Sequence, residues 1–87
     1  MLLREAVGQS LRSLRIRQGR TLRDVADAAG VSLAHLSAIE RGITEPSSEI
    51  IGALCRALGV ELGDLLDDIR RHLLRAAGRR SQFGLAA

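Results

Sequence analysis

Aromatic residues are almost absent from this sequence: Phe83 is the only one, and neither tryptophan nor tyrosine occurs. Leucine and alanine supply much of the apolar content instead, with 15 and 12 copies. Because these two residues favour helices, whereas strands are rich in aromatic and β-branched residues, the composition predicts an all-α fold. The length of 87 residues leaves room for one small core, which excludes an α/β barrel or a two-half dinucleotide-binding enzyme.

Cysteine and long apolar runs are equally scarce. Cys55 stands alone, so no internal disulfide can form and nothing indicates a secreted, disulfide-stapled scaffold. No apolar run exceeds four residues, which is far too short to span a membrane, and the residues after Met1 lack the apolar region of a signal peptide. We therefore expect a soluble, cytoplasmic protein without membrane association.

Lysine is missing altogether, and all 13 basic residues are arginine. The charge is segregated along the chain: the balance is +5 over residues 1–23, −7 over 24–69 and +5 over 70–87. A genome rich in GC would explain the preference for arginine, but it would not explain this segregation. Basic ends around an acidic middle predict that part of the surface meets a polyanion while an acidic face is turned elsewhere.

Apolar spacing, capping residues and glycines predict five helices. The first has one apolar face, made of Leu3, Val7, Leu11 and Leu14, and ends at Gly19. The others are expected at 21–29, 32–41, 47–58 and 62–77. Ile43 to Pro46 should form a loop, because the residue before a proline avoids the α region. Gly78 is expected to end the last helix and to leave residues 79–87 as a loose tail.

The segment from Leu22 to Arg41, LRDVADAAGVSLAHLSAIER, contains the strongest signal. It predicts two short helices joined by a three-residue turn, with the small Ala26 where the helices approach and Gly30 where the backbone needs positive φ. The contacts that would set the crossing angle come from Val25, Val31, Leu36 and Ile39. These requirements are those of a helix-turn-helix, whose second helix enters the DNA major groove by its N-terminal end. A helical hairpin that packs without any ligand is the alternative.

From about Leu11 to Leu66 the chain resembles the phage-repressor-like (XRE-type) helix-turn-helix family. The strings RTLRDVADAAGVSLAHLSAIERG and EPSSEIIGALCRALGV are similar to those of the actinobacterial Clp gene regulators. The resemblance implies a five-helix, lambda-repressor-like domain that binds a palindromic operator as a dimer and reads bases with its third helix. It also implies a transcriptional activator of Clp protease and chaperone genes. Leu22, where many relatives carry a DNA-contacting glutamine, and Ile43-Thr44, where closer relatives carry basic residues, depart from the pattern, so the operator sequence does not carry over.

Chemistry and position together assign roles in DNA binding. The residues expected to contact bases are Ser32, Leu33, Ala34, His35 and Ser37. Hydroxyl and imidazole groups can exchange hydrogen bonds with base edges, whereas leucine and alanine suit a thymine methyl group. The residues expected to contact phosphates, because they lie at helix ends flanking the groove, are Thr21, Arg23, Arg41 and Thr44.

The expected fifth helix has more apolar surface than such a domain needs. Its apolar stripe consists of Leu62, Leu65, Leu66, Ile69, Leu73 and Ala76. The first turns should complete the core, and the later residues should stay exposed on a monomer. We therefore expect a homodimer whose seam contains Leu73, Leu74, Ala76 and Ala77. The alternative is a helix folded back on its own domain. With the dimer as the main expectation, residues 1–69 form the DNA-binding domain, and residues 70–87 form a C-terminal helix extension with a flexible tail.

No catalytic or metal-binding constellation emerges. His35 and His72 lie on different helices without cysteines or carboxylates at metal-ligand spacing. Cys55 follows Leu54 and is expected to be a buried packing residue. The nine glycines are dispersed and form no phosphate-binding loop. We expect no metal, no cofactor and no enzymatic activity.

Double-stranded DNA is the expected partner, and two further partners are suggested. Asp24 and Asp27 on the second helix could meet RNA polymerase. The ending Phe83–Ala87 resembles the Leu-Ala-Ala ending read by Clp-type proteases and is a candidate degradation signal. Two other functions stay open: a steric repressor or antitoxin of the same fold, and a protein-interaction adaptor that has lost DNA binding.

Overall fold

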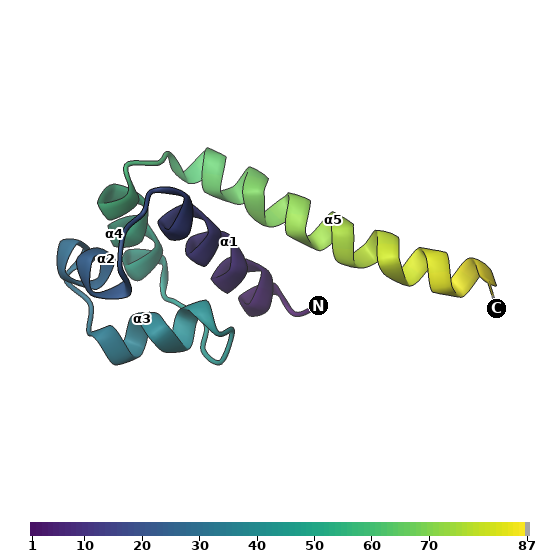
Figure 1. Ribbon diagram of the computed structural model, residues 1–87, viewed down its shortest axis with the longest axis horizontal. Coiled ribbons are helices and arrows are strands. Elements are labelled where there is room, and N and C mark those ends of the chain that lie inside the picture. Colours follow the sequence, from purple (N-terminus) through teal and green to yellow (C-terminus); the bar gives the residue numbers. More distant parts are fainter. Residues whose placement is uncertain (87) are drawn as a thin grey trace.

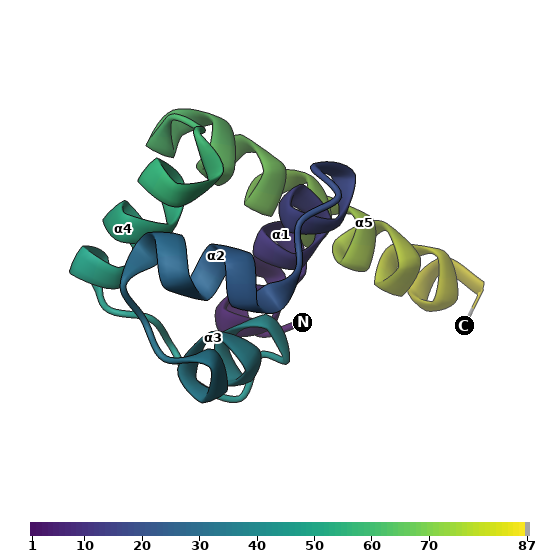
Figure 2. The ribbon, with the colours of Figure 1, turned by 60° about the vertical axis from the view of Figure 1, so that its left-hand side comes forward.

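The computed structural model describes the backbone of residues 1–86 and the side chains of residues 1–78. Its helices are α1 Leu3–Arg17, α2 Leu22–Ala29, α3 Leu33–Glu40, α4 Ser48–Leu58 and α5 Leu62–Ala86. Helices α1–α4 gather into one body, while α5 starts beside α1 and projects beyond it in both views (Figures 1 and 2). The prediction of five helices and no strands is confirmed for this part of the chain. No helix in it combines the length and the apolar composition needed to cross a bilayer.

The helix starts follow the predicted caps. Thr21 and Asp24 form a reciprocal capping box, in which each side chain accepts a hydrogen bond from the other residue's amide at 3.0 Å. These hydrogen bonds from Thr21 hold the pKa of Asp24 below its usual value. The hydroxyls of Ser32 and Ser47 cap α3 and α4 with a single hydrogen bond each, accepted from the amides of His35 and Ile50.

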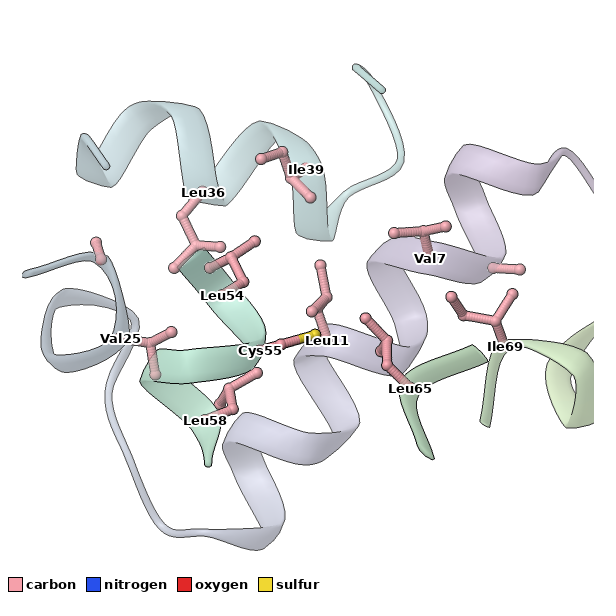
Figure 3. Close-up of a cluster of buried hydrophobic side chains, with 12 residues drawn as sticks. Val7, Leu11, Val25, Leu36, Ile39, Leu54, Cys55, Leu58, Leu65 and Ile69 are labelled. Atoms are coloured by element: carbon pink, nitrogen blue, oxygen red, sulfur yellow. The ribbon is translucent and has the colours of Figure 1, made fainter. Parts of the chain in front are cut away.

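One apolar core joins all five helices (Figure 3). Leu36 of α3 and Leu54 of α4 point toward each other, with Leu11 of α1 beside them and Leu65 bringing in the start of α5. Each of these four side chains is at most 2% exposed. Cys55 is buried in the same core, which confirms its predicted packing role, and burial raises the pKa of its thiol.

Helix α5 continues past Gly78, so the predicted helix end and the predicted loose tail are wrong for the backbone as far as Ala86. The glycines that follow helices and have positive φ, between 66° and 71°, are Gly19, Gly30, Gly42 and Gly59. Gly78 is not among them. A glycine with helical φ inside a helix costs only about 1 kcal/mol relative to alanine, which its neighbours can offset. The side chains of Phe83–Ala86 and all of Ala87 lie outside the described residues, so the degradation signal stays a prediction.

The apolar stripe of α5 divides between core and surface. Leu65 and Ile69 are buried, as predicted. Leu62 and Leu66 are 52% and 55% exposed, so the expectation that they complete the core is wrong. Leu73 packs partly buried against the core, whereas it was expected to be exposed on a monomer. The reason is that α5 lies mainly along a single helix, α1, which covers only one side of the stripe.

Candidate nucleic-acid interface

Helices α2 and α3 with the turn between them form the predicted helix-turn-helix. Gly30 ends α2 in the left-handed conformation, with φ 70° and ψ 30°. The Val31 amide then donates to the Ala26 carbonyl at 3.0 Å and closes the turn. Ala26 is 1% exposed, which confirms that the helices approach over a small side chain. The predicted apolar contacts come from the buried Val25, Leu36 and Ile39 and the partly buried Val31.

One face of α3 is open to solvent. Because successive helical residues are about 100° apart, Leu33, Ala34, Ser37 and Arg41 lie within an arc of about 100°. Three of these side chains are exposed and Ser37 is half-buried. His35 lies about 100° beyond Ala34, toward the buried side, and is half-buried. The structure therefore groups three of the predicted base-contacting residues on one face and places His35 at its flank.

Two further residues adjoin this face: Ser32, which was predicted to contact bases, and Ala38, which was not. Ser32 stands at the N-terminal end of α3, where its hydroxyl accepts from the His35 amide at 3.0 Å and keeps its own proton available for donation. Ala38, which was not among the predicted base contacts, is half-buried and lies about 40° beyond Ala34 around the helix. Its place four residues after Ala34 was the available signal, since residues i and i+4 share a helix face.

An ion pair between α1 and α3 anchors the C-terminal end of α3. Arg15 donates from Nε to Oε2 of Glu40 at 2.9 Å and from Nη2 to Oε1 at 3.0 Å. The side chains are only 14% and 6% exposed. The hydrogen bond to Glu40 raises the pKa of Arg15 and outweighs the opposing effect of burial. This pair could not be predicted from the sequence, because its members are 25 positions apart and nothing local links them.

Gly8 allows α1 and α3 to approach closely. A Cβ atom at this position would lie 2.4 Å from the carbonyl oxygen of Ile39 and 2.7 Å from that of Glu40. Arg4 adds a hydrogen bond from Nε to the Gly42 carbonyl at 3.1 Å. Helix α3 is therefore held on α1 by backbone contact and charged hydrogen bonds as well as by apolar packing.

The residues expected to contact phosphates lie at the start of α2, at the end of α3 and in the loop that follows α3. Thr21 and Arg23 are exposed at the start of α2, and Arg41 is exposed at the end of α3, where its Nε donates to the Ser37 carbonyl at 3.3 Å. Thr44 is half-buried in the loop before α4. A hollow of about 260 Å³ between the start of α2 and the end of α3 is lined by Arg12, Arg15, Leu22, Ser37, Glu40 and Arg41. Thr44 does not line it.

The predicted dimer seam is exposed only in part. Leu74 is 54% exposed and Ala77 is exposed, whereas Leu73 and Ala76 are half-buried. Leu66, which is 55% exposed, lies within about 80° of Leu74 around the helix and extends the exposed apolar side toward the body. Leu66 was expected in the core because it shares the apolar stripe with Leu65 and Ile69.

A charged cluster around Asp68 joins α5 to α1. Its carboxylate lies 3.3 Å from Arg71, 3.7 Å from Arg17 and 3.5 Å from His72. Burial raises the pKa of Asp68, but the neighbouring Ser10 hydroxyl and the groups on Arg71, His72 and Arg17 outweigh it, so the net shift is downward. In the part of the chain that the structure describes, no three His, Cys, Asp or Glu side chains gather as metal ligands.

Comparison with known proteins relates this geometry to a family. A family model described as helix-turn-helix matches residues 11–65. The transcriptional regulator ClgR of Mycobacterium tuberculosis is 53% identical over 74 residues, which are 85% of this chain and 66% of that protein. The chain therefore spans just under two thirds of that relative's length.

Solved structures agree with the predicted architecture. The crystal structure of the clp gene regulator ClgR from Corynebacterium glutamicum superposes with a TM-score of 0.91 at 40% identity, over 98% of this chain and 90% of that one. A restriction-modification controller protein, solved as a tetramer with its natural 35-base-pair operator, superposes with a TM-score of 0.80 at 19% identity, over 85% and 97% of the two chains. At this identity the second likeness concerns the fold alone. The five-helix, lambda-repressor-like fold predicted from the sequence is confirmed.

Proposed function

Since the chain belongs to the helix-turn-helix family of XRE type, we propose that it is a transcriptional regulator that binds a DNA operator and controls clp genes. The observation that carries the proposal is the exposed face of α3, held on α1 by the Arg15–Glu40 pair and the close approach at Gly8. A helix held in this way enters a major groove as a rigid unit. Membership of this family agrees with the expectation that the chain is not an enzyme. The function places the protein in the cytoplasm with the chromosome.

Base readout falls to the exposed face of α3, and phosphate contacts fall to its borders. Base contacts are proposed for Leu33, Ala34 and Ser37, with Ser32 and His35 beside them. The apolar side chains suit thymine methyl groups, and the hydroxyls exchange hydrogen bonds with base edges. Phosphate contacts are proposed for Thr21, Arg23, Arg41 and Thr44. These contacts orient the protein on the duplex but carry no sequence information.

Assembly is assigned to α5. Residues 1–69 read DNA, and residues 70–86 extend the helix that pairs two copies on a palindromic operator. The seam uses the exposed Leu66, Leu74 and Ala77, with the half-buried Leu73 and Ala76 at its edge. An apolar strip on a projecting helix is the surface that a two-fold dimer would cover.

Activation is assigned to the acidic side of α2. Asp24 and Asp27 are both exposed on the helix next to α3. The Asp24 carboxylate is engaged in the capping box, whereas Asp27 has no such role, so Asp27 is the better candidate for a contact with RNA polymerase. A regulator that offers this surface while bound upstream of a promoter recruits polymerase instead of blocking it.

Selection of bound duplexes from a random DNA pool tests the function directly. We expect enrichment of one two-fold symmetric sequence, bound at least about 10³-fold more tightly than unrelated DNA. Ser37→Ala should change base preference at one position, by about 1–3 kcal/mol. Arg41→Ala should instead weaken binding to all duplexes alike. A chain that shows no salt-dependent binding to any duplex would be an adaptor and not a regulator of this kind.

The seam is tested by Leu74→Asp, which adds a charge to α5 at an exposed position, unlike a change at the core-packed Leu73. The variant should stay folded but sediment as a monomer. Its operator affinity should fall about 100-fold, because the two half-sites are no longer bound together. Ser48→Asp, which adds the same charge at an exposed position on α4, is the control and should remain a dimer. A dimeric Leu74→Asp protein would contradict the proposed seam.

A further inference from the structure

The C-terminal end of α4 leaves two backbone carbonyls that its own cap does not use. The helix ends at Leu58, and Gly59 follows it in the left-handed conformation. This cap takes up the carbonyls of Cys55 and Arg56. The carbonyls of Ala57 and Leu58 belong to the last turn, where a helix has no amide of its own to donate to them. They therefore need donors from another part of the chain.

The segment between α1 and α2, residues 18–20, supplies both donors. Gln18 donates from Nε2 to the Leu58 carbonyl at 2.7 Å, and Arg20 donates from Nη1 to the Ala57 carbonyl. Both hydrogen bonds are partly buried and join residues 40 and 37 positions apart. A cation is also favoured beside the negative end of a helix dipole, so Arg20 suits this place by its charge as well as by its donors.

The backbone of Arg20 is held from the other side. Its carbonyl accepts from Nη1 of Arg15 at 3.0 Å, and the Nε and Nη2 atoms of the same guanidinium bind Glu40 at the end of α3. Thr21, the next residue, caps the start of α2. One chain of polar contacts thus runs from the end of α3, through α1 and residues 18–20, to the end of α4.

These contacts join two pairs of helices. Helix α5 lies mainly along α1, whereas α2 lies along α4. Residues 18–20 connect the end of α1 with the end of α4, and α5 leaves the body from the same corner, beginning at Leu62 (Figure 1). The segment therefore ties the helices assigned to assembly to the helices that position the helix-turn-helix.

We propose that Arg20 is a positioning residue for operator reading: it fixes the angle between the helix-turn-helix and α5, and so the spacing at which a dimer accepts two half-sites. The inference deepens the proposed function and rests on it, the dimer included. Two reading helices must reach grooves about 34–36 Å apart, so a small rotation of each helix-turn-helix relative to α5 changes the spacing that fits. Arg20 acts through this geometry and touches neither base nor phosphate.

Arg20→Ala in the full chain tests the proposal on the selected operator and on operators whose centre is one base pair longer or shorter. One base pair moves a half-site by about 3.4 Å and turns it by about 35°. The parent should bind the native spacing at least about 10-fold more tightly than either altered one, because misplaced half-sites cannot be bound together. For Arg20→Ala this ratio should fall below about 3-fold, while affinity for a duplex with one half-site should change by less than about 2-fold.

The ratio between spacings separates positioning from a general loss of stability. Partial unfolding lowers affinity for every duplex by the same factor and leaves the ratio unchanged. Arg20→Lys keeps a charged donor for the Ala57 carbonyl and should restore most of the preference for the native spacing. Gln18→Ala removes the neighbouring hydrogen bond and should relax the preference in the same direction as Arg20→Ala. Arg56→Ala, at an exposed arginine on α4, is the matched control and should keep the ratio of the parent.

Two results would overturn the proposal. One is an Arg20→Ala protein that keeps the spacing preference of the parent. The other is a loss of affinity for the single half-site as large as that for the whole operator, which would place Arg20 in direct contact with DNA. A parent that binds no duplex would instead refute the proposed function, and a parent that binds all spacings alike would refute the proposed dimer.

Discussion

Helix α1 makes two contacts of different character, one with α3 and one with α5. Toward α3 it has no side chain at Gly8, so backbones approach closely, and Arg15 forms a buried bidentate pair with Glu40. Toward α5 it offers apolar packing and one ion pair, between Arg17 and Asp68 at 3.7 Å, while the other two pairs of Asp68 lie within α5. The C-terminal end of α3 is therefore held closely on α1, whereas α5 is held over its first turns and projects its later turns beyond the body.

The two contacts should also differ in energy. Removing one member of a buried ion pair leaves an uncompensated charge and is strongly destabilising, whereas exposed pairs contribute about 0–1 kcal/mol. The Arg15 and Glu40 side chains are 14% and 6% exposed, whereas those of Arg17 and Arg71 are 61% and 51% exposed. Substitutions on the α3 side should therefore cost more stability than substitutions on the α5 side.

Glu40→Ala should show the largest effect. It leaves the Arg15 guanidinium buried without a counter-charge, and we expect the free energy of unfolding to fall by about 3 kcal/mol. Urea unfolding followed by circular dichroism measures the change. Glu45→Ala, an exposed glutamate in the loop before α4, is the control and should change stability by less than about 0.5 kcal/mol. Equal losses in the two variants would remove the distinction between the contacts.

Gly8→Ala should have the next largest effect. The added methyl group meets two backbone carbonyls on α3, which cannot rotate away, so we expect a loss of about 2 kcal/mol in unfolding free energy. Gly63→Ala, within α5, is the matched control, since a Cβ there meets nothing within 4 Å. That change should stabilise the protein by up to about 1 kcal/mol, because alanine favours helices. Relative to the parent, the Tm of thermal unfolding should fall for Gly8→Ala and rise for Gly63→Ala. A shift in the same direction for both variants would contradict the close approach of α1 and α3 at Gly8.

Asp68 should have the smallest effect, and it should depend on pH. The pKa of this carboxyl is lowered in the folded protein, so its contribution is present above the unfolded pKa of about 4 and is lost as pH falls through the folded value. Between pH 6 and pH 3 the free energy of unfolding should decline less for Asp68→Asn than for the parent protein. The difference between the two declines should be on the order of 1 kcal/mol. The pKa of Asp24 is also lowered, so Asp24→Asn should by itself reduce the dependence of the unfolding free energy on pH, independently of Asp68→Asn. A slope identical to the parent's would show that the α5 cluster contributes nothing.

The helix-turn-helix was predictable because its signals are local. The hydroxyl of Thr21 marks the start of α2, Gly30 marks its end, and Ser32 caps the next helix within a few residues. Such capping and turn preferences act within one or two turns of chain, so they are readable without knowing the fold. The C-terminal end of α5 could not be predicted from the sequence, because a glycine such as Gly78 is compatible with both a helix interior and a helix end.

The order of capping residues, glycines and apolar positions along the chain was thus sufficient to predict five helices and the helix-turn-helix formed by α2 and α3. The packing of distant segments decided which charged side chains form ion pairs within the protein and which do not. Arg12 and Arg15 look alike in the sequence, but Arg15 meets Glu40 from 25 positions away, whereas Arg12 meets no carboxylate in the described chain. The same holds for Leu65 and Leu66, one buried and one exposed. Whether a side chain is buried or its charge compensated depends on which distant residue packs against it. Only the tertiary structure determines which residue that is.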